Sequence, residues 1–251
     1  HTDRSMSLRG DPVKPLVTIT GASSGIGEAI ARRFSEAGHP LLLLARRLER
    51  MEALGLPDAM CEAVDVTDPE ALRAAIDRAE VRYGPVECLV NNAGMMLLGQ
   101  VDTQDRAEWK RMYELNVLAL LDGMQAVLGP MKERHTGTII NMSSIAGRKA
   151  FPDHAAYTGT KFAVSAITEN VREEVASDNV RVISICPGAT TSELLGHTTS
   201  ESIRDGYEEW KEEIGGVLDA DDVARAVLFA YQQPQSVCIR EIVLTPTRQE
   251  R

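Results

Sequence analysis

The chain has 251 residues, of which 43% are hydrophobic and 25% charged, and its formal net charge is −10. These values are ordinary for a globular protein with a sizeable core, and they argue against a disordered or fibrous chain. The negative charge disfavours nucleic-acid binding, which needs a basic surface, and no apolar stretch is long enough to span a bilayer. We expect neither nucleic acid nor membrane as a partner.

Residues 1–13 lack the apolar core of a secretory signal, and we expect them to form a flexible leader. Met6 is a candidate natural start, which would make residues 1–5 a cloning remnant. The cysteines form no CxxC pair and lie in or beside apolar runs, which indicates reduced, buried thiols. The five histidines show no metal-ligand spacing, so no metal site is predicted. Together these features predict a cytoplasmic protein.

Short apolar runs alternate with longer amphipathic stretches along residues 14–251. The runs, several of them rich in valine and isoleucine, predict buried strands at 16–20, 41–45, 60–66, 88–91, 138–142, 180–186 and 239–244. Helical patterns fill the intervals at 28–37, 69–83, 106–128, 155–177 and 221–231. Asp68 and Asp219 are the expected N-caps of the second and last of these helices.

This alternation predicts a single α/β domain: a doubly wound, parallel, seven-stranded sheet with helices on both faces. The least regular stretch is 189–218, between the sixth and seventh strands. An insertion at the carboxyl end of a strand is where a substrate lid is expected, although a plain pair of surface helices is the alternative.

The first predicted strand leads into the turn Gly21-Ala-Ser-Ser-Gly25-Ile-Gly27, and a helical pattern follows. Glycines at such a turn let the backbone approach a diphosphate, and the helix N-terminus supplies free N–H groups. The spacing differs from the common Gly-x-Gly-x-x-Gly fingerprint, so the glycines alone are a weak signal. Their position between a strand and a helix is what indicates dinucleotide binding.

The same turn also matches the Gly-x-Ser-x-Gly elbow of α/β-hydrolases, with Ser23 as the nucleophile. An elbow serine needs an oxyanion-hole loop from an earlier strand–helix junction. The turn follows the first predicted strand, so no earlier junction exists, and the dinucleotide interpretation is favoured.

The second predicted strand ends at Ala45, and Arg46 and Arg47 follow. Nucleotide-binding folds place an acid near this point to hold the adenosine ribose diol. Alanine replaces that acid here, and guanidinium groups suit a 2′-phosphate. The pattern predicts NADP(H) rather than NAD(H). The alternative is that the arginines only open a solvated helix with Glu49 and Glu52.

Tyr157 and Lys161 are four residues apart near the start of a predicted helix, which places them on one face. A tyrosine has a pKa near 10, and lowering it by about 3 units requires about 4 kcal/mol. An ammonium about 4 Å away supplies roughly 4 kcal/mol at an effective dielectric constant of about 20. One adjacent lysine is therefore sufficient to activate the phenol, although the pattern alone also arises by chance.

With these motifs, the sequence resembles the short-chain dehydrogenase/reductase family in its compact single-domain form. The resemblance implies a Rossmann fold and NADP(H)-dependent hydride transfer between nicotinamide and a carbonyl or secondary alcohol. The matching positions, in the family's order, are residues 20–27, Asp65, residues 91–94, Asn116, residues 141–147, Tyr157, Lys161 and residues 187–188.

The resemblance implies roles for four catalytic side chains. Tyr157 would be the general acid/base, and Ser144, whose neighbour Ser143 is easily confused with it, would hydrogen-bond the substrate oxygen. Lys161 would hold the nicotinamide ribose and lower the pKa of Tyr157. Asn116 would help to hold a water of the proton relay.

The coenzyme contacts that we expect surround the glycine turn and the ends of the neighbouring strands. Ser192 stands where the family often has threonine, and it keeps the hydroxyl. The full set is Gly21, Ser23, Ser24, Gly25, Ile26, Gly27, Arg46, Arg47, Asp65, Val66, Asn92, Ala93, Gly94, Tyr157, Lys161, Pro187, Gly188 and Ser192.

The segments 187–195 and 240–248 also resemble a bacterial branch of the family that includes dehydrogenases of 3-hydroxy acids and serine and reductases of reactive aldehydes. The substrate is thus expected to be a small carbonyl compound or alcohol. Residues expected to border its pocket are Met95, Met96, Phe151, His154 and Leu194, each of which has an equally plain core or surface interpretation.

Two other functions remain open: a non-catalytic NADP(H) sensor, and an epimerase or dehydratase on the same fold. The intact tyrosine and lysine argue against a sensor. By resemblance we also expect a homodimer or homotetramer that packs the helices at 106–128 and 155–177 across a two-fold axis. Phe162, Ala166 and Val171 fit such a contact, as they fit a buried core face.

Overall fold

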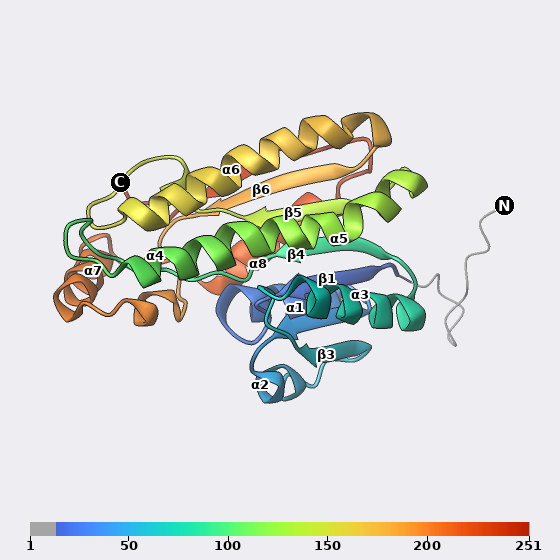
Figure 1. The fold of residues 1–251 in the computed structure, drawn as a ribbon, viewed down its shortest axis with the longest axis horizontal. Coiled ribbons are helices and arrows are strands. Elements are labelled where there is room, and N and C mark those ends of the chain that lie inside the picture. The colour runs from blue at the N-terminus through green and yellow to red at the C-terminus, as the bar shows by residue number, and fades with distance from the viewer. Residues whose placement is uncertain (1–13, 251) are drawn as a thin grey trace.

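Seven parallel strands form one sheet in the order β3-β2-β1-β4-β5-β6-β7 (Figure 1). The computed structural model describes residues 14–250, so the predicted leader at 1–13 lies outside the described residues. The doubly wound α/β sheet predicted from the sequence is confirmed. The strands are β1 Leu16–Thr20, β2 Leu41–Ala45, β3 Ala59–Ala63, β4 Val86–Asn91, β5 Thr138–Met142, β6 Arg181–Pro187 and β7 Glu241–Leu244.

Helices cover both faces of this sheet. Strand β2 shows why, because all four of its leucines are fully buried and alternate between two apolar clusters. One cluster includes side chains of α1 and α8, and the other those of α3, α5 and α6. The α-helices are α1 Gly25–Glu36, α2 Leu48–Glu52, α3 Pro69–Tyr83, α4 Arg106–Tyr113, α5 Ala119–Arg134, α6 Ala155–Val175, α7 Glu201–Glu213 and α8 Ala220–Gln232.

Both predicted N-caps are confirmed. The Asp68 carboxylate accepts hydrogen bonds from the amides of Glu70 and Ala71 at the start of α3. Asp219 and Asp222 form a reciprocal capping box at the start of α8. These bonds satisfy amide groups that a helix N-terminus leaves unpaired.

Several predicted boundaries shift by one to three residues in the structure, and two of the differences have a clear structural cause. The third strand ends at Ala63 rather than at residue 66. The reason is that the Asp65 carboxylate accepts hydrogen bonds from the amide and the hydroxyl of Thr67, which turns the chain. The helix predicted over 106–128 is not one helix: the π-helical turn η1, Glu114–Leu118, separates α4 from α5. Such π turns are rare and occur frequently at functional sites.

The strand order reverses between β1 and β4, which are adjacent in the sheet but not in the chain. In open parallel sheets, ligands bind in the crevice beyond the carboxyl ends of the strands at such a switch point. The carboxyl ends of β1, β4 and β5 carry Gly21, Asn92 and Ser143. Across residues 14–250, no helix is both long and apolar enough to cross a bilayer.

Candidate active site

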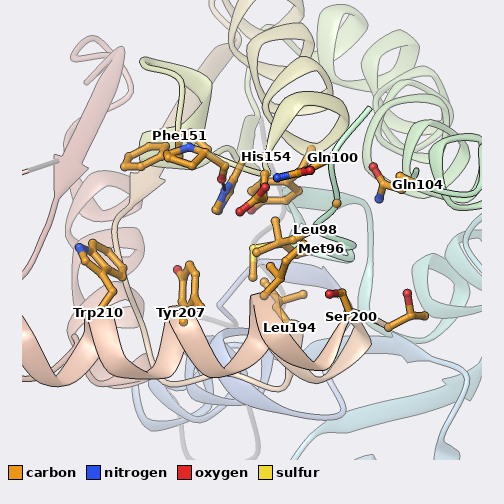
Figure 2. A pocket seen from close by; sticks show the side chains of 18 of the residues that line it. Met96, Leu98, Gln100, Gln104, Phe151, His154, Leu194, Ser200, Tyr207 and Trp210 are labelled. Atoms are coloured by element: carbon orange, nitrogen blue, oxygen red, sulfur yellow. Dashed lines mark hydrogen bonds between the residues drawn. The ribbon is translucent and has the colours of Figure 1, made fainter. Parts of the chain in front are cut away.

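Two cavities lie at the carboxyl edge of the sheet. The glycine-turn cavity, of about 440 Å³, is lined by Gly21, Gly25 and Arg47 among others. The tyrosine cavity, of about 930 Å³, is lined by Ser144 and Tyr157 among others, and Figure 2 shows side chains around it. Leu194 lines both cavities, so they adjoin.

The glycine turn is shaped by contacts that leave no room for side chains. Gly21 and Gly25 have φ angles of +66° and +54°. A Cβ on Gly27 would lie 2.1 Å from the Gly21 carbonyl oxygen. The Asn92 side-chain nitrogen donates to the Gly21 carbonyl oxygen at 3.2 Å and to the Thr20 carbonyl oxygen at 3.0 Å. The backbone can therefore approach a ligand closely at this point.

The turn has the donors that a dinucleotide diphosphate requires. Helix α1 begins at Gly25, and its N-cap Ser24 makes no side-chain capping bond. The first amides of the helix and the Ser23 and Ser24 hydroxyls stand at the glycine-turn cavity. The chain thus fits a diphosphate by both shape and chemistry.

Arg47 joins this turn to the segment that follows β6. One of its terminal nitrogens donates to the hydroxyls of Ser23 and Ser24 at 3.2 and 3.0 Å and to the Glu193 carboxylate at 2.9 Å. Arg50 donates to the other oxygen of Glu193 at 2.7 Å. Hydrogen bonds from Arg50 and Arg47 lower the pKa of Glu193 to about 2. No sequence pattern indicated a role for Glu193, which lies 146 residues from Arg47.

Most of the coenzyme residues predicted from the sequence line the glycine-turn cavity. Gly27 lies behind the turn, and Pro187 lines neither cavity but accepts a 3.5 Å hydrogen bond from Ser144. Gly188 lines the tyrosine cavity instead. The predicted residues at the glycine-turn cavity are Gly21, Ser23, Ser24, Gly25, Ile26, Arg46, Arg47, Asp65, Val66, Asn92, Ala93, Gly94 and Ser192.

Tyr157 is 5% exposed and lies with Ser144 at the wall of the tyrosine cavity. Burial raises the pKa of Tyr157, and the Ser144 hydroxyl opposes this shift. The lowering of this pKa that was expected from Lys161 is not found, since burial is the largest cause of the shift and Lys161 is not among the groups that oppose it. Lys161 donates from Nζ to the Met142 carbonyl oxygen at 2.9 Å, and burial lowers its own pKa to about 8. A buried phenol of this kind holds its proton at neutral pH.

The two adjacent serines after β5 point to different places. Ser143 is buried and hydrogen-bonds the Lys161 carbonyl oxygen at 3.1 Å and the Ser165 hydroxyl at 2.8 Å, both on α6. Ser144 lines the tyrosine cavity beside Tyr157. Ser143 therefore fastens α6 to the sheet, and Ser144 faces the cavity.

Asn116 is the central residue of the π turn and is 2% exposed. Its side chain accepts from the Met95 amide at 2.8 Å and donates to the Met95 carbonyl oxygen at 2.9 Å and to the Thr160 hydroxyl at 3.1 Å. A Cβ on Gly94 would lie 3.3 Å from the Asn116 amide oxygen and 3.9 Å from Lys161 Nζ. Asn116 thus joins the loop after β4 to the base of α6.

A family model described as short chain dehydrogenase matches residues 15–202. The chain belongs to the short-chain dehydrogenase family. An oxidoreductase of uncharacterised function from Staphylococcus saprophyticus is 36% identical over 240 residues, which cover 93% of this chain and 96% of that protein. This short-chain dehydrogenase is accordingly an oxidoreductase.

Solved structures resemble this short-chain dehydrogenase along nearly its whole length. The closed form of a serine dehydrogenase complexed with NADP⁺ has a TM-score of 0.88 at 29% identity and covers 94% of this chain and 96% of its own. ElxO with NADP bound has a TM-score of 0.82 at 26% identity, with 92% and 97% covered.

The segment 189–218 of the short-chain dehydrogenase covers the tyrosine cavity. Its ends are paired, since the Thr191 amide donates to the Leu218 carbonyl oxygen at 2.9 Å and the Leu218 amide to Ala189 at 2.8 Å. Between these ends lie the 3₁₀ turn η4, Leu194–His197, and α7, which contributes Tyr207 and Trp210 to the cavity wall (Figure 2).

Hydrogen bonds to residues far away in the sequence attach the segment 189–218 to the rest of the domain. The Thr198 hydroxyl accepts from the Leu98 amide at 3.1 Å, and the Thr199 hydroxyl donates to the Glu108 carboxylate at 3.0 Å. No sequence pattern singled out Thr198 or Glu108. Of the five residues expected at the substrate pocket, Met96, Phe151, His154 and Leu194 line the tyrosine cavity, whereas Met95 lines the other one.

Proposed function

We propose that this chain is an NADP(H)-dependent oxidoreductase that interconverts a carbonyl compound and the corresponding alcohol, with Tyr157 as the general acid/base. The observation that carries the proposal is that Ser144 and Tyr157 lie together in the wall of one large cavity that adjoins the glycine-turn cavity. This arrangement offers a carbonyl oxygen two hydroxyl groups in the wall of the tyrosine cavity.

In the direction of reduction, the substrate oxygen lies between the hydroxyls of Ser144 and Tyr157. Ser144 orients this oxygen and stabilises the negative charge that develops on it. Tyr157 donates its proton to it, a role suited to a phenol whose pKa is raised by burial. Bound NADPH supplies the hydride for the substrate carbon.

Lys161 and Asn116 are proposed to support Ser144 and Tyr157. Lys161 lies one helical turn beyond Tyr157 on α6, and its proposed role is to bind ribose hydroxyls and to return a proton toward Tyr157. Its pKa of about 8 suits such a transfer near neutral pH. Asn116 fixes the loop of Gly94 against Lys161.

The coenzyme preference rests on Arg46 and Arg47 at the glycine-turn cavity. Ala45 ends β2 in place of the acid that would hold a ribose diol, and both guanidinium groups suit a 2′-phosphate. The relatives complexed with NADP⁺ or NADP support the same preference. Residues 189–218 are the proposed substrate lid.

A homodimer or homotetramer is the proposed assembly. Exposed apolar side chains lie along η1, α5 and α6: Leu118 is 54% exposed, Leu121 37% and Phe162 45%. Ala166 is also exposed, whereas Val171 packs half-buried against the core. The free thiols Cys61, Cys88, Cys186 and Cys238 are compatible with the proposed cytoplasmic location.

The test is a panel of aldehydes, ketones and hydroxy acids assayed with NADPH, NADH and their oxidised forms. We expect carbonyl-dependent loss of NADPH absorbance and a much smaller rate with NADH. An NADPH sensor would bind the coenzyme without turning over any member of the panel, and that result contradicts the proposal.

A further inference from the structure

The tyrosine cavity carries negative groups and no lysine or arginine within the described residues. Three carboxylates line it: Asp105, Glu108 and Asp153. Its one basic side chain is His154, which is buried and donates from Nδ1 to the Pro152 carbonyl oxygen. Burial lowers the pKa of His154, so the imidazole is neutral at neutral pH. A carboxylate-bearing substrate finds no counter-ion there.

Glu108 is the most buried of these acids, with 6% of its surface exposed. Its carboxylate accepts from the Gln104 side-chain nitrogen at 3.0 Å and from the Thr199 hydroxyl at 3.0 Å. Both donors are neutral, and no cation pairs with Glu108 in the part of the chain that the structure describes. Hydrogen bonds of this kind hold a carboxylate in place without cancelling its charge.

Rings line the same cavity as a series of neighbours that begins at Trp210 on α7 and ends at Tyr157. Figure 2 shows Trp210, Tyr207 and His154 of this series. The Trp210 and Tyr207 rings are 5.2 Å apart, Tyr207 and His154 6.0 Å, and His154 and Tyr157 6.1 Å, between centroids. Phe151 lies 5.6 Å from His154. The faces of such rings are electron-rich and attract ammonium groups.

One lysine beside this wall lies outside the cavity. Lys149 Nζ is 5.6 Å from the centroid of the Phe151 ring, but Lys149 is exposed and does not line the cavity. Lys161 is directed to the Met142 carbonyl oxygen instead. The described side chains that line the interior are therefore apolar, aromatic, neutral polar or acidic, and none of them is a lysine or arginine.

We infer that the substrate of this site is an aldehyde or ketone that carries an ammonium group, which the aromatic wall and the unpaired carboxylates would accommodate. The inference rests on the proposed function. In the reaction, the carbonyl carbon accepts hydride from NADPH and the carbonyl oxygen accepts the Tyr157 proton, which gives an alcohol and NADP⁺. The ammonium group keeps its bonds and its charge throughout.

Three aldehydes of matched shape test this inference. Each has three methylene groups between the aldehyde and its far end: 4-(trimethylammonio)butanal is cationic, 5,5-dimethylhexanal is its neutral isostere, and 5-oxopentanoate is anionic. We expect kcat/KM with NADPH to fall in that order, by about tenfold or more at each step, as a single charge in a partly screened site requires.

Two variants separate the charge of Glu108 from its contact with the lid. Glu108→Gln removes the charge and keeps an oxygen for Thr199, and Thr199→Val removes the contact and keeps the charge. We expect Glu108→Gln to lower the ratio of kcat/KM for the cationic over the neutral aldehyde about tenfold. Thr199→Val should leave that ratio as it is, because any effect of a loosened lid is common to both aldehydes.

The outcomes distinguish this inference from the proposed function. Turnover with the anionic aldehyde preferred, or a ratio that Glu108→Gln does not change, overturns the inference and leaves the oxidoreductase standing. Bound NADPH with no turnover of any of the three aldehydes, or of the wider panel, overturns the proposed function and the inference with it.

Discussion

Lys161 lies one helical turn beyond Tyr157 on α6, and its Nζ is 5.8 Å from the centroid of the tyrosine ring. Neither side chain is free to turn away, because both are buried and Lys161 is held by the Met142 carbonyl oxygen at 2.9 Å. Lys161 Nζ is therefore held in a fixed position near the tyrosine ring.

Removing the Tyr157 hydroxyl should abolish turnover and spare coenzyme binding. Tyr157→Phe keeps the ring contacts with His154 and loses the proton donor, so we expect kcat/KM to fall by about 10²–10⁴-fold. The Kd for NADPH, measured by fluorescence titration, should stay within about twofold.

Tyr83→Phe is the matched control, because the Tyr83 hydroxyl is buried without a hydrogen-bond partner in the described residues. It should leave kcat/KM unchanged. Substantial activity in Tyr157→Phe refutes the assignment of the acid/base.

Arg47 should set the preference for NADPH. Arg47→Gln removes a charged donor from the glycine-turn cavity, and a charge-assisted bond contributes about 1.5–3 kcal/mol, so NADPH should bind about 10–100-fold more weakly. NADH, which lacks the 2′-phosphate, should be affected far less. Isothermal titration with both coenzymes measures this difference.

Arg50→Gln provides the comparison, since Arg50 shares Glu193 with Arg47 but does not line the cavity. Its effect on NADPH should be clearly smaller. Equal losses for NADPH and NADH in Arg47→Gln contradict a role in reading the 2′-phosphate.

Glu193 should compete with that phosphate for Arg47. The Glu193 carboxylate pairs with Arg47 and Arg50 at 2.9 and 2.7 Å, and its pKa of about 2 keeps it charged throughout the neutral range. Such exposed pairs contribute about 0.2–1 kcal/mol, so Glu193→Gln should tighten NADPH binding about two- to fivefold. The gain should shrink at high salt.

Binding of NADH serves as the reference in the same titrations and should change little. Weaker binding of NADPH by Glu193→Gln would mean that the carboxylate positions Arg47 for the phosphate rather than competing with it.

Gly27→Ala should disrupt the turn from within. The new Cβ would lie 2.1 Å from the Gly21 carbonyl oxygen and 2.5 Å from the Asn92 side-chain nitrogen, so part of the turn must move. We expect a loss of about 1–3 kcal/mol in the free energy of unfolding and at least tenfold weaker NADPH binding.

Gly129→Ala is its counterpart in α5, where a Cβ meets no atom within 4 Å. Alanine is the better helix former, so this variant should be more stable by about 0.5–1 kcal/mol. Urea unfolding measures the change in the free energy of unfolding for both variants. An unchanged free energy of unfolding together with normal affinity for NADPH in Gly27→Ala contradicts the prediction.

The free energy of unfolding should fall as the pH drops below 6.5, the ordinary pKa of histidine. Burial lowers the pKa of His39, His154 and His197. The unfolded chain then binds more protons than the folded one between the lowered pKa and 6.5, so stability rises with pH across that window and is lost on acidification.

His39→Gln tests this away from the active site. His39 donates from Nδ1 to the Pro15 carbonyl oxygen and packs against Phe34 and Tyr231. The variant should show a shallower dependence of stability on pH over this window in urea titrations. The exposed His135, replaced by asparagine to suit its positive φ, is the control. An unchanged slope in His39→Gln contradicts the prediction.

The sequence predicted the elements whose signals are local. Strands β1, β2 and β5 have the predicted bounds because their short apolar runs end in polar or glycine-rich turns. Helix α3 begins and ends as predicted, since Asp68 caps its first turn and Gly84 ends it with a φ of +84°.

The π turn had no comparable signal. The apolar spacing of residues 106–128 is compatible with a regular helix, and the wider turn follows from tertiary bonds that Asn116 makes to Met95 and Thr160. Those partners lie 21 and 44 residues away, beyond the reach of a periodicity argument.

The candidate site divides in the same way. Motif spacing located Tyr157, Lys161, Ser144 and the glycine turn, but it did not show what the neighbouring Ser143 does, because the two serines differ in the direction of their side chains. The partners of the segment 189–218 also escaped prediction, because a buried acid such as Glu108 has the sequence pattern of an exposed residue on a polar helix.

The π turn makes this enzyme intolerant of a particular kind of genetic change. A five-residue turn holds one residue more than its span in an α-helix needs, so deleting one of the four residues of Glu114–Leu118 other than Asn116 would let α4 and α5 fuse into one regular helix. Such a deletion improves helical bonding, and the protein could fold at least as readily. The deletion would nevertheless rotate the Asn116 side chain away from the Met95 backbone, and we expect a protein that folds but is inactive.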